Sequence, residues 1–263
     1  MGNFAKISQS LMKAYVDYVN KKECGVFFKA RYIDKDPDCE NIIPSDAMKL
    51  GMYFEYMATG SLPRNGVVPE AEYVYKGTPK ERIGVAYERA NQSAQLFKRI
   101  IKHYDINIQD VGVVLATDIA KGIIDIFAEW GGRAVFIDLK YSGLIDDKWN
   151  ESGWDLESLP QKDSLMVQGV QYKILAEDCL GVVDIPFYYF VFSSADPNNV
   201  KIILQNVDES RIASHRLAIN NLLEKLETEK FTPFPTMKRC GECPLAYKCE
   251  FATTVPLIDR VDY

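Results

Sequence analysis

The sequence predicts an α/β fold in which a central mixed β-sheet is flanked by helices. Three β-branched and aromatic segments follow one another at residues 111–117, 122–130 and 134–140, and two more follow at 187–193 and 200–205. Segments with helical spacing of apolar residues stand before, between and after them. This order is typical of a sheet covered by helices.

The helical segments are recognised by apolar residues that recur at intervals of three or four positions. Ser45 and Asp46 are suitable caps for one of these helices, and Pro79 is a suitable first residue for another. The chain from Thr232 onward is rich in Pro and Cys, and we expect it to be irregular. The predicted helices span residues 7–22, 45–59, 79–103, 164–179 and 208–229.

Two turns indicate which strands are neighbours. Gly131-Gly132 stands between the second and third strand segments and predicts a two-residue hairpin. The residues 196–199, Asp-Pro-Asn-Asn, join the last two strand segments in the same way. The second and third strands, and the last two, should therefore be adjacent in the sheet.

The composition is that of an ordinary globular protein, with 263 residues, 47% hydrophobic and 26% charged. We expect a single domain over residues 1–263 with a core at about 45–206. No apolar run is long enough to span a membrane, and the first ten residues lack the apolar stretch of a secretion signal. We therefore expect a cytoplasmic protein with no membrane partner, whose six cysteines are thiols or metal ligands.

The net charge of −6 argues against a protein that coats DNA as a non-specific polycation. It does not exclude an enzyme that acts on nucleic acid. A site for divalent cations needs carboxylates, and local basic surfaces occur on proteins that are acidic in total.

Two acids and a lysine stand in an apolar hairpin. Asp125 lies in its first strand, and Asp138 and Lys140 lie two positions apart in its second, so these two share one face of the strand. Placing such charges among apolar residues costs free energy unless they are paired or bind a metal. Carboxylates that hold Mg²⁺ or Mn²⁺, with a lysine that positions or deprotonates water, are typical of phosphodiester hydrolysis. A surface hairpin with an ordinary Asp–Lys pair is the alternative.

Two more pieces flank this hairpin. Upstream, Gly51 and Glu55 lie four apart on a predicted helix, and downstream Gln168 and Tyr172 have the same spacing. In this order the pieces resemble the PD-(D/E)XK nuclease superfamily, and within it the RecB-like branch. That branch includes nuclease domains of bacterial helicase–nucleases, CRISPR-associated spacer-acquisition exonucleases and phage exonucleases. Its pattern is G-x-x-x-H/E, G-x-x-D, D/E-x-K and Q-x-x-x-Y, read here as Gly51/Glu55, Gly122/Asp125, Asp138/Lys140 and Gln168/Tyr172.

The resemblance covers about residues 45–180 and implies a restriction-endonuclease-like core. It implies that Glu55, Asp125 and Asp138 are metal ligands, together with the carbonyl oxygen of Leu139. Lys140 would position the attacking water. Glu55 departs from the commoner form, in which many members have His, and this makes the site more acidic. The resemblance further implies that Gln168 and Tyr172 contact DNA near the scissile phosphate.

Four cysteines have the spacing of a metal site. Cys240, Cys243 and Cys249 form C-x2-C-x5-C, and Cys24 lies far upstream. Such closely spaced thiolates fit a tetrahedral metal or an iron–sulfur cluster that needs a fourth ligand. Spacing alone does not separate iron–sulfur from zinc, and free cysteines are the third reading.

The same family has members with one cysteine before the nuclease core and three after it, which bind a [4Fe–4S] cluster. The resemblance therefore implies a [4Fe–4S] cluster on Cys24, Cys240, Cys243 and Cys249, held by segments 8–30 and 232–252. Such a cluster closes nearly the whole chain into a loop and should stabilise the fold rather than transfer electrons. Cys39 and Cys179 fall outside the pattern. Cys179 ends an apolar helix and is expected to be buried.

Other features carry weaker signals. His103 ends a helix, where a cation is favoured, and no nucleophile elbow accompanies either histidine. Trp149 and Trp154 could stack on unpaired bases or cover the edge of the sheet. The helix predicted at 79–103 is rich in Lys and Arg, which fits either a face that binds phosphates or a solvated basic face.

The sequence thus predicts a Mg²⁺- or Mn²⁺-dependent DNA nuclease, an exonuclease acting on single-stranded ends, with DNA and a helicase or recombination protein as partners. Two alternatives stay open. One is a DNA-end-binding or adaptor subunit of a helicase–nuclease or CRISPR spacer-acquisition complex. The other is a zinc-stabilised nucleic-acid-binding protein without catalysis.

Overall fold

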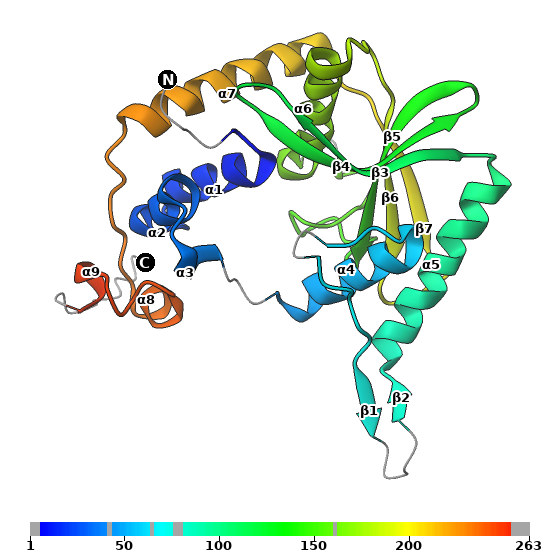
Figure 1. Cartoon of the computed structure of the whole chain (residues 1–263), viewed down its shortest axis with the longest axis horizontal. Helices are drawn as coiled ribbons and strands as arrows, with labels where there is room; N and C mark the ends of the chain where they lie inside the picture. Colours follow the sequence, from blue (N-terminus) through cyan, green and yellow to red (C-terminus); the bar gives the residue numbers. More distant parts are fainter. Residues whose placement is uncertain (1–5, 41–43, 64–65, 76–80, 160–161, 254–263) are drawn as a thin grey trace. The chain divides into compact units, whose positions relative to one another are not determined.

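The structure is a computed structural model of the whole chain (Figure 1), described here for residues 6–40, 44–63, 66–75, 81–159 and 162–253. The chain divides into two compact units. Unit 1 comprises residues 1–43, 118–120 and 214–263, and unit 2 comprises residues 44–117 and 121–213.

Unit 2 contains a five-stranded mixed sheet, as predicted. Its strand order is β3-β4-β5-β6-β7, which follows the order of the strands in the sequence. Only the pair β5 and β6 is parallel within this sheet, and the other neighbours are antiparallel. The strands are β3 (Asn107–Ala116), β4 (Lys121–Trp130), β5 (Arg133–Ser142), β6 (Phe187–Ser193) and β7 (Val200–Gln205).

The connections between these strands follow from local chemistry. Gly131 and Gly132 have φ angles of 59° and 75°, the left-handed conformations that a tight hairpin requires and glycine adopts without strain, so the predicted turn is confirmed. The parallel pair needs a long crossover, which is supplied by α6 (Asp163–Leu180). The result is a β-α-β unit whose first strand carries Asp138 and Lys140.

Helices cover both faces of the sheet (Figure 1). The helices α4 (Asp46–Thr59) and α5 (Val85–His103) pack on one face, through a core that includes Phe54, Phe97 and Phe192. The helix α6 covers the opposite face of the sheet, where it contacts β3, β4 and β6. Side chains alternate along a strand, so Leu139 of β5 faces the first core and its neighbours Asp138 and Lys140 face α6.

The predicted start of α5 was wrong. The helix begins at Val85, with Gly84 as its N-cap, and Glu81–Ile83 forms the short strand β2 instead. This strand pairs with β1 (Tyr73–Tyr75) in an antiparallel ribbon that extends from the α4–α5 end of unit 2 in Figure 1. Pro79 itself lies outside the described residues. Ribbon pairing uses backbone groups that the helix would have needed, so pairing and not Pro79 sets where the helix begins.

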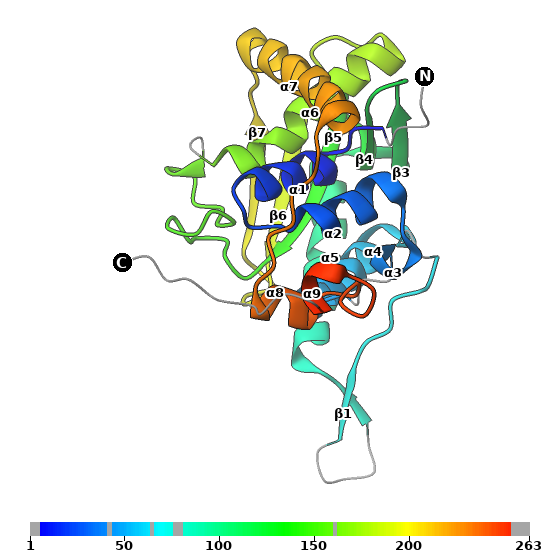
Figure 2. The same ribbon diagram turned by 90° about the vertical axis from the view of Figure 1, so that its left-hand side faces the viewer.

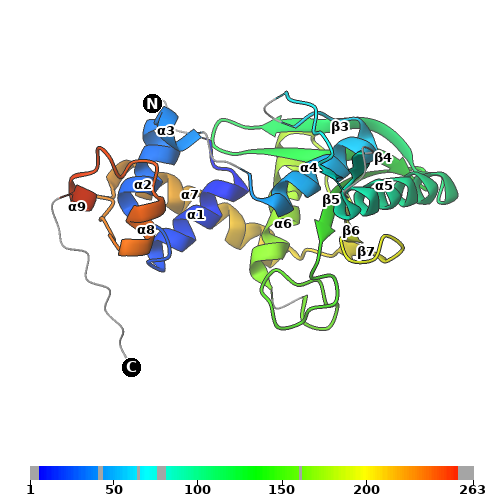
Figure 3. The ribbon, with the colours of Figure 1, turned by 90° about the horizontal axis from the view of Figure 1, so that it is seen from below.

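Unit 1 brings together segments from the two halves of the chain. Figures 2 and 3 show its N-terminal helices together with α8 and α9. The tail that was expected to be irregular contains these two short helices, which is a correction. Its elements are α1 (Gln9–Val19), α2 (Gly25–Lys29), the π-helix η1 (Ala30–Asp34), α3 (Pro37–Glu40), α8 (Met237–Glu242) and α9 (Glu250–Thr253); α7 (Glu209–Thr228) begins in unit 2 and continues here.

An aromatic cluster holds the tail of unit 1 in place. Phe231 lies 5.4 Å from Tyr18 and 5.1 Å from Phe28, measured between ring centroids, and Phe234 also packs on Tyr18. Lys248 pairs with the carboxylates of Asp36 and Asp38 at 2.8 and 2.6 Å. Apolar burial and ion pairs therefore connect the N-terminal and C-terminal segments independently of the cysteines.

Within the part of the chain that the structure describes, no helix is both long and apolar enough to cross a membrane.

Candidate active site and cysteine pocket

The predicted acids and lysine meet where the β4–β5 hairpin opens. The ladder between the two strands runs from the turn to Ile126 and Ile137 and stops there. Beyond that point, a carboxylate oxygen of Asp125 accepts the backbone N–H of Leu139 at 2.8 Å. The side chain of Asp125 thus replaces a backbone acceptor, while β5 continues beside β6 as far as Ser142.

Asp138 is fully buried and paired on both oxygens. Lys140 Nζ lies 2.6 Å from Oδ2, in an ionic contact rather than a well-directed hydrogen bond, and about a third of the lysine side chain (32%) remains exposed. Gln168 donates a hydrogen bond from Nε2 to Oδ1. The carboxylate is therefore held by its own strand and by α6 together.

Gln168 and Tyr172 lie inside the protein, with 9% and 6% of their surfaces exposed. The Tyr172 hydroxyl donates to the Ile123 carbonyl and lies 3.2 Å from Gln168 Nε2, which donates to it. The two residues thus form a chain from β4 through α6 to Asp138. Their contact with DNA stays a prediction, because the role visible here is to orient a carboxylate. The Ile123 carbonyl was missed by sequence reasoning, although it adjoins Gly122 in the motif.

Gly122 explains the glycine of the G-x-x-D motif. A Cβ atom at this position would lie 2.4 Å from Cε1 of Tyr172, closer than atoms can approach. The tyrosine ring therefore needs the missing side chain in order to reach Ile123. Gly51 is different, because a Cβ atom there would meet nothing within 4 Å. The glycine of G-x-x-x-E has no packing role that this structure reveals.

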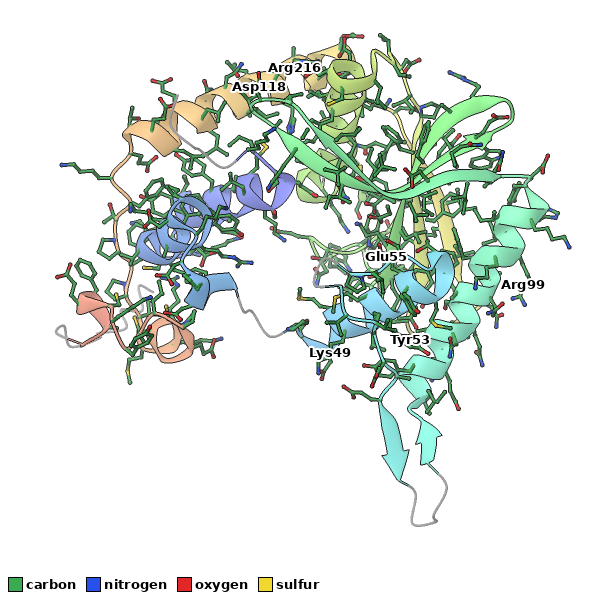
Figure 4. The ribbon with its side chains drawn as sticks, in the orientation of Figure 1. Lys49, Tyr53, Glu55, Arg99, Asp118 and Arg216 are labelled. Carbon is green, nitrogen blue, oxygen red and sulfur yellow. The ribbon has the colours of Figure 1, made fainter. Side chains whose placement is uncertain are left out.

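Glu55 lies on the side of α4 that faces the sheet (Figure 4). It is half-buried, and its charge contributes to raising the pKa of Asp125. The three predicted acids thus influence one another electrostatically, although they come from a helix and two strands. A metal-ligand role for the Leu139 carbonyl stays a prediction.

The site holds more carboxyl groups than cationic groups. Burial and the neighbouring Asp138 raise the pKa of Asp125 well above its usual value, against the opposing effect of Lys140. Asp125 keeps some exposure, so we attribute its shift as much to the adjacent carboxylate as to burial. Burial raises the pKa of Asp138, while Lys140 lowers it in part. Burial disfavours the charged lysine, but Asp138 and Asp125 outweigh this and raise the Lys140 pKa. One lysine thus balances only one of two carboxylates.

These residues fit a hard divalent cation by their chemistry. Carboxylate oxygens are the ligands that Mg²⁺ and Mn²⁺ prefer, and a cation would neutralise the surplus charge. In the described part of the chain, no three His, Cys, Asp or Glu side chains are grouped closely enough to hold one ion as they stand. Binding of a cation therefore requires the Asp138–Lys140 contact to loosen and Asp125 to be ionised.

The four predicted cluster cysteines line one pocket of unit 1. Cys24, Cys240, Cys243 and Cys249 surround a cavity of about 190 Å³ whose wall is otherwise largely apolar. Cys24 Sγ accepts the backbone N–H of Phe234 at 3.5 Å. Burial raises the pKa of the Cys243 thiol, and the other three cysteines raise it further. Cysteines that are more than two hundred positions apart in the sequence thus line the same pocket.

The remaining two cysteines differ from each other. Cys39 is buried in a small core with Ala30 and Leu245, against which Cys243 packs, and it does not line the pocket. Cys179 is exposed, so the expectation that it is buried was wrong. It lies in the last turn of α6, where residues 177–180 are all exposed.

The other candidate residues, two tryptophans and two histidines, differ in how exposed they are. Trp154 is buried against Tyr189, and Trp149 is 87% exposed with Lys148 Nζ 5.0 Å from its ring centroid. Only Trp149 remains available for stacking. His103 is exposed in the last turn of α5, and His215 is buried, which lowers its pKa.

Comparisons with known proteins identify the fold. No protein-family model matches the sequence, and no curated protein matches it either. A crystal structure from Eubacterium rectale, titled a "putative exonuclease", is similar over 98% of this chain and 91% of its own, with a TM-score of 0.64 and 17% sequence identity. At that identity the likeness shows a shared fold. A second solved structure, at 13% identity and over 62% of this chain and 68% of its own, has a TM-score of 0.30 and carries no argument.

The two motif glycines should respond oppositely to alanine. Gly122→Ala forces the Tyr172 ring aside and should lower the free energy of unfolding by about 1–3 kcal/mol. Gly51→Ala adds a methyl group to open space inside a helix and should raise the same free energy by about 0.5–1 kcal/mol. Urea denaturation of both variants measures the difference. Equal effects of the two substitutions would contradict the packing role of Gly122.

The charge surplus predicts that Asp125→Asn stabilises the metal-free protein. A carboxyl whose pKa is raised by folding contributes stability below its unfolded pKa and loses it as pH rises through the folded pKa. Asparagine keeps an acceptor for the Leu139 N–H and does not ionise. The gain in melting temperature should therefore be small near pH 4 and larger at pH 8, measured in EDTA. A gain that is constant with pH would refute the charge argument.

Proposed function

We propose that the protein is a metal-dependent nuclease. The observation that carries the proposal is the pairing of buried Asp138 and adjacent Asp125 with a single lysine, held in place by Gln168 of α6. This arrangement places two carboxyl groups beside one lysine, and a bound cation would favour the ionised form of both carboxyl groups. The exonuclease name of the structurally similar protein from Eubacterium rectale supports the same direction.

Glu55, Asp125 and Asp138 are the residues that would hold Mg²⁺ or Mn²⁺. When bound, such an ion activates water for attack on phosphorus and stabilises charge on the phosphate. The Leu139 carbonyl would be a further ligand. Cation binding favours ionised carboxylates, so Asp125 would release a proton on binding.

With a cation bound to Asp138, the Lys140 ammonium group would no longer be needed to neutralise that carboxylate. It would then be free to hold the attacking water or a phosphate oxygen at the same face of β5. Gln168, fixed by Tyr172, would keep the Asp138 carboxylate in a single orientation throughout. Such preorganised positioning supplies much of the rate of phosphoryl-group hydrolysis.

For the substrate we propose DNA, with hydrolysis from single-stranded ends, in a protein that acts with a helicase or recombination partner. The sequence motifs support this choice. The adaptor alternative requires no chemistry and leaves the buried Asp138–Lys140 pair without a use, and so does a non-catalytic zinc protein. Digestion of end-labelled single-stranded and double-stranded DNA, with Mn²⁺ and with EDTA, tests the proposal directly. Absence of Mn²⁺-dependent products from every substrate would favour the adaptor.

For the cysteine pocket we propose a [4Fe–4S] cluster as a structural element. A tetrahedral zinc site with Zn–S bonds of 2.3 Å draws its sulfurs to about 3.8 Å from one another and leaves no cavity. Here four thiols line a cavity of about 190 Å³. A cluster is larger than an ion and suits such a space.

Asp138→Ala and Lys140→Ala should separate metal binding from chemistry. Both should reduce Mn²⁺-dependent cleavage, the lysine variant by roughly 10²–10⁴. Calorimetric titration with Mn²⁺ should show binding lost in Asp138→Ala and kept in Lys140→Ala. Asp146→Ala is the matched control, because Asp146 also pairs with a lysine, Lys201, but at an exposed position outside the site. Wild-type turnover in Asp138→Ala would refute the site.

Anaerobically purified protein should be brown, with about four irons and four sulfides per chain. Cys24→Ser should remove the colour, lower the melting temperature and expose the chain to protease beyond Phe234, because the aromatic cluster still anchors the part before it. Cys179→Ser, which changes an exposed thiol, should keep the colour. One tightly bound zinc in a colourless anaerobic preparation would replace the cluster by a zinc site.

A further inference from the structure

One face of α5 carries cations without an acidic partner among the residues that the structure describes. Four residues, which we call the basic face of α5, are exposed, and in the described part of the chain no carboxylate pairs with any of them. Residues 89–104 contain no Asp or Glu, and the one acid of α5, Glu88, is exposed in its first turn, directly before Arg89. The basic face consists of Arg89, Lys98, Arg99 and Lys102.

The helix places these residues in one continuous strip. Positions 92, 95, 99 and 102 recur every three or four residues and follow one side of the helix, with Arg89 at one edge of this strip and Lys98 at the other, about half a turn apart around the helix axis. Exposed glutamines occupy positions 92 and 95, so the strip presents hydrogen-bond donors between the cations. At 1.5 Å per residue, it extends for roughly 20 Å. Figure 4 shows Arg99 on the outer side of α5, away from the sheet.

The helix dipole does not account for this pattern. Cations are favoured in the last turn of a helix, which explains Lys102, but Arg89 lies near the N-terminus, where a cation is disfavoured. General solubility does not account for it either, because exposed helices usually interleave both signs. The helix α7 of the same chain does so, with three acids and three bases among Glu209, Arg211, Arg216, Glu224, Lys225 and Glu227.

The basic face also adjoins the elements of the active site. The helix α5 packs on α4, which carries Glu55. Ala90, which directly follows Arg89, packs in the same core as Tyr141. Tyr141 follows Lys140 directly in β5 and stacks on Phe54 of α4. The strip therefore begins beside the strand that carries the catalytic candidates and leads away from it.

We propose that the basic face of α5 binds the sugar–phosphate backbone of a nucleic acid strand. Regularly spaced phosphates are the polyanion that matches a straight row of cations and amide donors. Acidic side chains elsewhere would repel such a strand, and this would confine it to the strip. The proposal rests on the nuclease function, since the bound strand would be the part of the substrate that lies outside the reacting nucleotide.

The test compares binding by two triple variants in EDTA, which prevents cleavage. In the first, Lys98→Gln, Arg99→Gln and Lys102→Gln are combined, because glutamine removes the charge and keeps helix propensity. The dissociation constant for a labelled 30-nucleotide single strand at 0.1 M salt should rise at least about tenfold. The slope of its logarithm against that of salt concentration should fall by about 2, since each lost phosphate contact contributes about 0.7.

The matched control removes the same charge from exposed lysines of unit 1, through Lys13→Gln, Lys225→Gln and Lys230→Gln, and should leave affinity and slope unchanged. Circular dichroism verifies the folding of both variants. An unchanged slope in the α5 variant overturns the proposal, and so does an equal loss in the control. Equal loss of binding to polyglutamate overturns it in favour of a general anion site. Wild-type protein that binds DNA without cleaving it would instead refute the nuclease function alone.

Discussion

The organisation of unit 2 depends on one electrostatic constraint, two carboxylates next to a single lysine in a largely apolar environment. Asp138 is satisfied only because Lys140 shares its strand face and Gln168 reaches it from α6. Asp125 is satisfied only because the β4–β5 ladder ends in time for Leu139 to offer its N–H. If the hairpin ladder were longer, Asp125 would be buried without the Leu139 N–H as its hydrogen-bond donor. It would also lie farther from Asp138. The opening of the hairpin is therefore a requirement of the site.

The same constraint explains why distant motifs must occur together. Gln168 can reach Asp138 only if α6 lies close against β4, and that distance is set by the contact of Tyr172 with Gly122. The parallel β5–β6 pairing in turn fixes where the crossover helix begins and ends. A displacement of α6 would therefore disturb the positions of the acids even if no motif residue were changed. The spacing of the motifs in the sequence therefore reflects the packing distance between α6 and β4.

Much of the fold was predictable because its signals are local. The turn at Gly131-Gly132 and the strand alternation around Asp138 require only neighbouring residues. What depended on tertiary packing was not predictable. The start of α5 moved to Val85 because a ribbon forms before it, and Cys179 proved exposed because it lies in the last turn of α6, where residues 177–180 are all exposed. The side chain of Gln168 points inward because of how α6 is placed on the sheet. The spacing of Q-x-x-x-Y does not predict that placement.

The distribution of charge between the candidate metal site and the basic face of α5 follows one principle. A catalytic centre that binds cations concentrates acids, and a surface that binds a polyanion must exclude them, so a protein with both needs the two kept apart. Here Asp138 lies on the face of β5 that meets α6, whereas Glu55 lies on α4, on the same side of the sheet as α5, and faces the sheet. The cations of the basic face are exposed on α5, and the apolar core around Phe97 lies between α5 and the sheet. A net charge of −6 is then compatible with binding to nucleic acid, because affinity depends on where the cations stand and not on their total.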